Sequence, residues 1–202
     1  MEEQFKQHAQ ALVDAGHALS AWGMVPATSG NLSARLDDGN IVITVSGKHK
    51  GKLTVDDLML IDADGNSLDG RRSSAETLLH TQVYRRHPEI NAVLHPHSIN
   101  AVLLSRYVEG PIALQGYELL KALSGISTHA TSISLPVFEN DQDIQRLAAV
   151  VDGYMDTHDP IHGYLINGHG FYAWGKTVDD ALRHVEALDF LFACELKSLQ
   201  LR

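Results

Sequence analysis

Hydrophobic and polar positions repeat along the chain with two different periods. Over residues 2–22 the apolar positions recur every three or four residues, which predicts an amphipathic helix at the start of the chain. The segments 31–36 and 41–45 are rich in alternating or β-branched residues on either side of a polar turn, so they predict a β-hairpin. The segment 58–65 predicts a further strand that ends in an Asp-Gly turn.

The rest of the chain alternates between the same two patterns. Helices are predicted over 73–86, 112–123, 143–155 and 177–199. Strands are predicted over 90–98, over 132–138 and on both sides of the glycine-rich bend within 163–175. Helices interleaved with short strands and hairpins predict an α/β domain whose sheet is mixed or mainly antiparallel.

Length and composition favour a single folded unit. The 202 residues suit one domain spanning 1–202, because soluble domains commonly contain ~100–200 residues and no repeat or flexible linker divides this chain. An apolar content of 44 % excludes intrinsic disorder. No apolar run approaches the ~18 residues of a membrane span, and the opening residues lack a secretory signal pattern. We therefore expect no membrane partner.

Charge and cysteine content narrow the partners and the compartment. The chain has 16 Lys+Arg and 25 Asp+Glu, a net charge of −9, so it has no basic surplus with which to bind nucleic acid. The one cysteine, Cys194, allows no intramolecular disulfide and fits the reducing cytoplasm. The 12 histidines direct attention to metal or proton chemistry.

Two histidines, His95 and His97, end the strand predicted over 90–98. Residues i and i+2 of a strand point to the same face, so both imidazoles can approach one ion. Pro96 between them limits the backbone, which suits the end of a strand. A solvent-exposed pair at a sheet edge explains the pattern equally well.

A catalytic zinc site needs three protein ligands and an open position. His169 is the best third candidate, because Gly168 and Gly170 allow a close backbone approach, although an ordinary turn would give the same pattern. Two other histidines are weaker candidates: His162 and His129. His80, one turn after Glu76, is expected to pack or to cap rather than to bind a metal.

Two carboxylates are candidates for acid–base chemistry. Glu118 lies among mostly apolar and amide residues, where partial desolvation would raise its pKa toward the working range. With Lys121 three residues later, it can equally belong to a solvated helix face. Glu76 follows Ser73 at the spacing of a capping box, so it serves either the start of a helix or the chemistry.

Three short loops, at 28–31, 44–47 and 73–74, combine hydroxyl side chains with glycines. A helix that starts just after the third loop would add backbone donors and a positive dipole end for an anion. Five basic residues lie near these loops: Lys48, Lys50, Lys52, Arg71 and Arg72. No Walker or GxGxxG pattern is present, so nucleotide binding is not expected. Each loop alone is no more specific than an ordinary turn.

In their order, five segments of the chain resemble the class II aldolase/adducin family: TSGNLSARL (28–36), ITVSGKHKGKL (43–53), SSAETLLH (73–80), AVLHPHS (92–98) and LINGHGFYAWGKTVDDALRHVEALDFL (165–191). The resemblance implies an antiparallel sheet between helix layers and a homo-oligomer, expected to be a tetramer. It implies one zinc ion per subunit on three histidines: His95, His97 and His169. Its phosphate-binding positions fall on four residues: Asn31, Ser46, Gly47 and Ser74.

Within the family, QGYELLKAL (115–123) resembles a branch that dehydrates a phosphorylated, methylthio-bearing ketose in methionine salvage. This resemblance places Glu118 at the branch's acid–base glutamate. The chain also ends directly after its last predicted helix, as expected for that branch. Ala75 separates Ser74 from Glu76, whereas the aldolases have the serine pair next to the glutamate, so the role of Glu76 is left between catalysis and capping.

Two other functions remain to be distinguished. A sugar-phosphate aldolase of the same family would cleave a ketose 1-phosphate or 5-phosphate and release an aldehyde. A metal-free scaffold with the same fold would perform no chemistry. The presence of all three candidate histidines argues against the scaffold.

Overall fold

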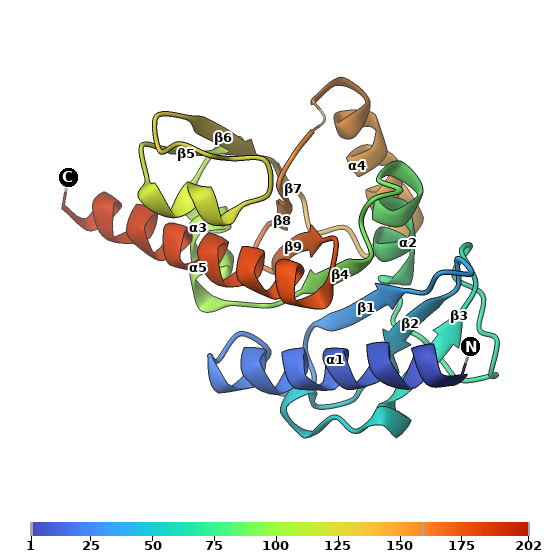
Figure 1. Ribbon diagram of the computed structural model, residues 1–202. Coiled ribbons are helices and arrows are strands. Elements are labelled where there is room, and N and C mark those ends of the chain that lie inside the picture. The colour runs from blue at the N-terminus through green and yellow to red at the C-terminus, as the bar shows by residue number, and fades with distance from the viewer. Residues whose placement is uncertain (1, 159, 202) are drawn as a thin grey trace.

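The computed structural model describes residues 2–158 and 160–201, which are built around a seven-stranded sheet (Figure 1). The strand order is β3-β2-β1-β4-β9-β8-β7, and neighbours are antiparallel except for the parallel pair β7 and β8. The strands are β1 (Asn31–Arg35), β2 (Ile41–Thr44), β3 (Leu58–Ile61), β4 (Ala92–His95), β7 (Val137–Phe138), β8 (Tyr164–Ile166) and β9 (Gly170–Gly175). The helices are α1 (Glu2–Ala21), α2 (Thr77–Arg86), α3 (Ile99–Tyr107), α4 (Ile144–His158) and α5 (Val178–Gln200).

Alternation along the strands divides the buried side chains between two cores. On β1, Leu32 and Ala34 join the apolar cluster that includes α1 and α5. Ser33 points to the opposite face, where its hydroxyl bonds His80 of α2. This division follows from the two-residue period of a strand. It sends the polar positions of β1 toward α2 and, as described below, toward the functional site.

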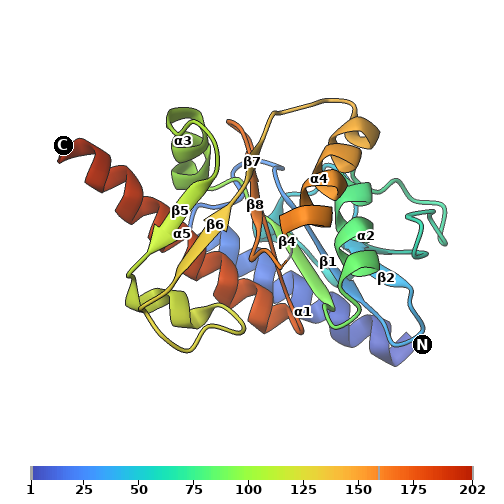
Figure 2. The ribbon, with the colours of Figure 1, turned by 90° about the horizontal axis from the view of Figure 1, so that it is seen from above.

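The helices form a layer on each side of the sheet. Helices α1 and α5 cover one face and α2 and α4 the other (Figures 1 and 2). The apolar cluster on the second face contains residues from α2, α4 and the sheet. The prediction of an α/β fold with a central, mainly antiparallel sheet between helices is therefore confirmed.

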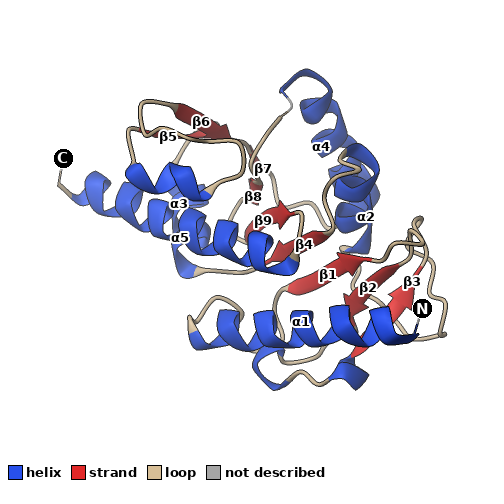
Figure 3. Cartoon of the chain, in the orientation of Figure 1, coloured by secondary structure: helices blue, strands red, loops and turns tan. Residues whose placement is uncertain are grey.

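The segment predicted as a helix over 112–123 begins instead as a strand. Residues Ile112–Gln115 form β5, which pairs with β6 (Ser132–Leu135) in a separate two-stranded sheet (Figure 3). Only Glu118–Ala122 is helical, as the 3₁₀ segment η3. Along β5 buried and exposed positions alternate, which is the period of a half-buried strand and was mistaken for a helical pattern.

Two helices also differ from the prediction. Helix α2 begins at Thr77 rather than at residue 73, which changes the role of Glu76. Helix α3 was not predicted; the Ser98 hydroxyl caps it by accepting a hydrogen bond from the Ala101 amide (3.1 Å). Among the described residues, no helix combines the length and apolar character needed to cross a membrane.

Candidate metal centre and active site

Four side chains from distant parts of the chain converge at the end of β4: Glu76, His95, His97 and His169. Their ligand atoms all lie within 4.8 Å of one another. Nε2 of His97 is 3.0 Å from Nε2 of His95, and Nε2 of His169 is 3.2 Å from Oε1 of Glu76. Nε2 of His95 is 3.6 Å from Oε2 of Glu76. Three imidazoles and one carboxylate thus face a common point.

The backbone around the histidine pair sets this convergence. His95 is the last residue of β4, and His97 lies two residues later on the same side. The Pro96 carbonyl accepts a hydrogen bond from the Phe171 amide of β9 (3.1 Å). A Cβ on Gly170 would lie 2.4 Å from that carbonyl oxygen, so only glycine permits the approach. The glycine after His169 therefore has the close-approach role that the sequence suggested.

The third histidine is held in the turn between β8 and β9. The His169 amide donates to the Ile166 carbonyl (3.1 Å), and Gly168 has φ +64°, a left-handed conformation that favours glycine. The Gly168 amide donates to the hydroxyl of Ser105 on α3 (3.0 Å). Helix α3 thus supports the turn from outside, and the His169 ring is directed at Glu76.

The protonation of the imidazoles suits a cation. Nδ1–H of the buried His95 donates to the Phe171 carbonyl (2.8 Å), which leaves the lone pair of Nε2 toward the cluster. Burial, followed by the neighbouring His169, lowers the pKa of His95 well below its usual value. Burial and then His95 lower the pKa of His97 to about 3. Both rings are neutral at pH 7, the form that binds metals.

The spacing of the donor atoms fits a transition metal. Ligands about 2.1 Å from a tetrahedral zinc ion are about 3.4 Å apart. Three of the six separations in the cluster run from 3.0 to 3.6 Å, and all six are within 4.8 Å. Nδ1 of His169 is buried without a hydrogen-bond partner among the described residues. The donor set and its spacing therefore fit a metal ion.

Glu76 does not cap a helix. It precedes α2, but its side chain makes no capping hydrogen bond. Its Oε2 accepts a hydrogen bond from the Asn31 side-chain amide (2.7 Å), and both carboxylate oxygens face histidines. The capping-box interpretation is wrong, because α2 begins at Thr77, which places Glu76 just before the helix and not at its third position, where a capping-box glutamate lies.

A cavity of about 280 Å³ opens beside the cluster. It is lined by residues of the three glycine- and hydroxyl-rich loops, together with Glu76 and His97. All four predicted phosphate-binding positions are among the lining residues: Asn31, Ser46, Gly47 and Ser74. The three loops, each unspecific by itself in the sequence, thus meet at one place next to the histidine and glutamate cluster.

The sequence does not distinguish Lys50 from the other four basic residues near the loops, but Lys50 is the one lysine that lines this cavity. Its side chain is 2 % exposed, and Nζ donates to the carbonyls of Thr28 and Lys48 (both 2.8 Å). Burial lowers the pKa of Lys50 to about 8, while Glu76 acts in the opposite direction. Lys50 therefore remains largely protonated at pH 7, and it places a positive charge at this cavity although the protein as a whole has a net charge of −9.

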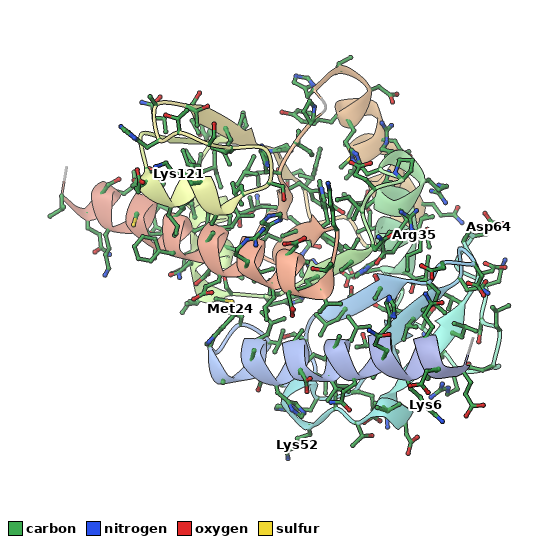
Figure 4. All side chains as sticks on the ribbon, in the orientation of Figure 1. Lys6, Met24, Arg35, Lys52, Asp64 and Lys121 are labelled. Atoms are coloured by element: carbon green, nitrogen blue, oxygen red, sulfur yellow. The ribbon has the colours of Figure 1, made fainter. Side chains whose placement is uncertain are left out.

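Glu118 lies elsewhere in the described chain. Its side chain is 72 % exposed on η3, next to Lys121, which is labelled in Figure 4. Glu118 pairs with Lys121 and lies 3.5 Å from Nδ1 of His129. The hydrogen bond from Lys121 lowers the pKa of Glu118, so the expected rise through desolvation is wrong for a single copy of the chain. Within one copy, Glu118 belongs neither to the four-residue cluster nor to the cavity lining.

The other candidate histidines are outside the cluster. His129 is exposed beside Glu118. His162 is half-buried, and burial followed by His184 lowers its pKa. His80 is buried and bonds the side chains of Asn31 and Ser33, so it packs as expected.

Comparison with known proteins agrees with this geometry. The family profile described as Class II Aldolase and Adducin N-terminal domain matches residues 10–196. This match covers almost the whole chain, and the fold has a mainly antiparallel sheet between helix layers. The chain therefore belongs to the class II aldolase and adducin family.

Individual relatives are similar over nearly their whole length. A methylthioribulose-1-phosphate dehydratase from Methylococcus capsulatus is 61 % identical over 97 % of this chain and 96 % of its own. A protein of the same name from Pseudomonas aeruginosa strain PAO1 is 53 % identical over 100 % of this chain and 99 % of its own. Among solved structures, L-fuculose-1-phosphate aldolase from Thermus thermophilus has a TM-score of 0.75 at 26 % identity, covering 98 % of this chain and 95 % of that one.

Proposed function

We propose that this chain removes water from 5-methylthioribulose 1-phosphate to give 2,3-diketo-5-methylthiopentyl 1-phosphate, a step of methionine salvage. The observation that carries this proposal is 61 % identity to a methylthioribulose-1-phosphate dehydratase along almost the entire length of both chains. The site supports this proposal, because its imidazoles and carboxylate lie beside a cavity that is lined by the buried side chain of Lys50.

The cofactor in this proposal is one zinc ion per chain, held by His95, His97 and His169. Neutral imidazoles are good zinc ligands, and Glu76 is close enough to join them or to be displaced when substrate binds. Bound there, zinc would supply Lewis-acid polarisation of the substrate C2 carbonyl, which acidifies the C3 proton.

The phosphate group belongs in the cavity beside the cluster. Ser46, Gly47 and Ser74 would offer hydroxyl and backbone donors, and Lys50 a nearby positive charge. The Asn31 amide already bonds Ser74 (3.3 Å) and Glu76 (2.7 Å), so it reaches the phosphate by giving up the weaker Ser74 contact. A phosphate held here orients the reacting carbons against the cluster.

Glu118 is our proposed acid–base group, and it would come from a neighbouring copy of the chain. Its carboxylate would take the C3 proton, and the C–H electron pair would form the enediolate. The protonated Glu118 would then protonate the C4 hydroxyl, which leaves as water, and the enol product would tautomerise to the diketone. Its exposure on η3 supports this arrangement, because a surface carboxylate can reach another subunit's site. A cytoplasmic homotetramer completes the proposal.

The activity test uses the purified zinc-loaded protein with 5-methylthioribulose 1-phosphate. We expect the diketone phosphate to accumulate at the rate of substrate loss, with no aldehyde. Release of an aldehyde from this substrate, or cleavage only of other ketose phosphates, would identify an aldolase and overturn the proposal. The His95→Ala variant is the control: it should lose metal and activity together.

A further inference from the structure

A buried chain of polar side chains runs from the carboxylate of Glu76 into the space between β1 and α2. Its members are Asn31 and Ser33 on β1, and His80 and Tyr84 on α2. Asn31 and Ser33 are two residues apart on a strand, so they share a face. Glu76, His80 and Tyr84 are successively four residues apart, so they follow one side of the helical turn. The chain forms where these two faces meet.

Each link of this chain is a direct hydrogen bond. The Asn31 side-chain amide donates to Oε2 of Glu76 (2.7 Å), and Oδ1 of Asn31 bonds Nε2 of His80. Nδ1 of His80 is 2.7 Å from Oγ of Ser33, which is 2.8 Å from the hydroxyl of Tyr84. All four side chains are buried, with exposed fractions of at most 4 %. Water therefore does not compete for these bonds.

The carboxylate of Glu76 at one end determines the direction of every hydrogen bond in this series. A carboxylate only accepts, so the Asn31 nitrogen faces Glu76 and the Asn31 oxygen faces His80. Nε2 of His80 must then carry the proton. Burial lowers the pKa of His80 to about 4, so the ring is neutral and Nδ1 accepts from Ser33. Ser33 in turn accepts from Tyr84, whose pKa is raised by burial and which stays protonated.

The outer end of the chain is also held in place. The guanidinium of Arg35, labelled in Figure 4, lies 5.3 Å from the centre of the Tyr84 ring. Arg35 also donates to the Tyr84 carbonyl (3.0 Å). Four buried, hydrogen-bonded side chains thus lie behind a carboxylate that has no capping role and faces the histidine cluster.

We propose that His80, Ser33 and Tyr84 are positioning residues that act through Asn31 to hold the Glu76 carboxylate against the histidine cluster. All donors point toward Glu76, and such aligned bonds reinforce one another. The chain occupies Oε2 of Glu76 with the Asn31 amide and leaves Oε1 beside His169. This inference rests on the proposed metal-dependent function only in that the cluster binds a metal.

The test replaces His80 in two ways and reads metal binding separately from turnover. His80→Leu removes both ring nitrogens, whereas His80→Gln keeps a donor near the Nε2 position. The protein is loaded with Co²⁺, and its visible spectrum, its zinc affinity by chelator competition, kcat and KM are measured. We expect His80→Leu to shift the Co²⁺ spectrum, to weaken zinc binding and to lower kcat, the latter two by about 10-fold or more. KM should change little, and His80→Gln should restore most of each loss.

A second pair of variants separates positioning from packing. Tyr84→Phe removes the hydroxyl at the outer end of the hydrogen-bonded series from Glu76 to Tyr84. Tyr164→Phe removes a buried hydroxyl that has no hydrogen-bond partner among the described residues. We expect Tyr84→Phe to shift the Co²⁺ spectrum in the same direction as His80→Leu, and Tyr164→Phe to leave it unchanged. If His80→Leu does not fold, as judged by thermal unfolding, the Tyr84→Phe comparison alone decides.

A double mutant tests whether these hydrogen-bonded side chains affect the metal site through Glu76. In a Glu76→Gln background, His80→Leu should cause little further change in the spectrum, because the group that it positions is already altered. Equal shifts in both backgrounds, or a wild-type spectrum for both His80→Leu and Tyr84→Phe, would overturn the inference. Failure of the proposed function would instead leave the wild-type protein unable to dehydrate the substrate while these Co²⁺ results stand.

Discussion

Replacing Gly170 with alanine tests whether the close approach of two backbones assembles the histidine cluster. Gly170 begins β9, directly after His169, and lies against the Pro96 carbonyl between the other two histidines. A Cβ at this position would be 2.4 Å from the Pro96 oxygen, 3.1 Å from Cδ2 of His97 and 3.2 Å from Cε1 of His95. One added methyl group therefore presses on all three segments that carry the ligands.

The size of the effect follows from these distances. Ordinary contact begins at 3.4 Å, so the Gly170 Cβ and the Pro96 oxygen must separate by about 1 Å. A displacement of about 1 Å at a reaction centre can cost about 100-fold in rate. Overpacking of a rigid region also costs about 1–3 kcal/mol of stability. We expect zinc affinity to fall by about 10-fold or more, because the His169 turn must move away from the His95 and His97 pair.

The measurements are zinc affinity by chelator competition, dehydration rate and urea unfolding of Gly170→Ala. The matched control is Gly153→Ala in α4, where a Cβ meets no atom within 4 Å. Helix propensity should make that control more stable by about 0.5–1 kcal/mol with unchanged zinc affinity. If Gly170→Ala bound zinc and turned over substrate as the wild type does, the close backbone approach would not be needed for the site.

Three other expectations can be tested on the same protein. Lys50→Met removes a buried charge and should raise both KM and the inhibition constant of inorganic phosphate by about 10-fold or more, whereas Lys48→Met should leave both constants nearly unchanged. The same KM and inhibition constant in the two variants would contradict a role for Lys50 in phosphate binding. The pKa of His80 is about 4 in the folded protein and 6.5 for a free imidazole, so the unfolded chain binds the proton first and the metal-free protein should lose stability as the pH is lowered from about 6.5 toward 4. A urea midpoint at pH 5 as high as the midpoint at pH 7.5 would refute this. If Glu118 acts across subunits, mixed oligomers of Glu118→Gln and His95→Ala, each inactive alone, should regain up to about a quarter of wild-type activity, because some sites then combine an intact His95 with an intact Glu118 of the neighbour. Co-expressed mixed oligomers without any activity would exclude that arrangement.

The strongly periodic parts of the fold could be predicted from sequence. The alternating residues of β1 predict a strand, the apolar run of β4 predicts a buried strand, and the spacing of His95 and His97 puts both rings on one side of the sheet end. The glycines around His169 signalled a close approach, and Gly170 makes that approach. Local pattern was sufficient there, because strand period and glycine sterics do not depend on distant neighbours.

The remaining site features depend on tertiary contacts. Ser73 and Glu76 have capping-box spacing, but α2 begins after Glu76, and the Glu76 carboxylate lies against His95 and His169 instead. Lys50 is one of several basic residues in the loops, and its burial is set by the carbonyls of Thr28 and Lys48. For Glu118 the missing surroundings belong to another copy of the chain in our proposal, so neither pattern nor a single copy can supply them.

X-ray absorption spectroscopy of the zinc-loaded protein tests the histidine centre most directly. We expect one zinc ion per chain with three imidazole nitrogens at about 2.0–2.1 Å, oxygen completing the shell, and no sulfur. In His95→Ala the same spectrum should lose imidazole scattering together with zinc occupancy. A wild-type spectrum with fewer than three imidazoles, or with sulfur at about 2.3 Å, would contradict a catalytic ion held by His95, His97 and His169.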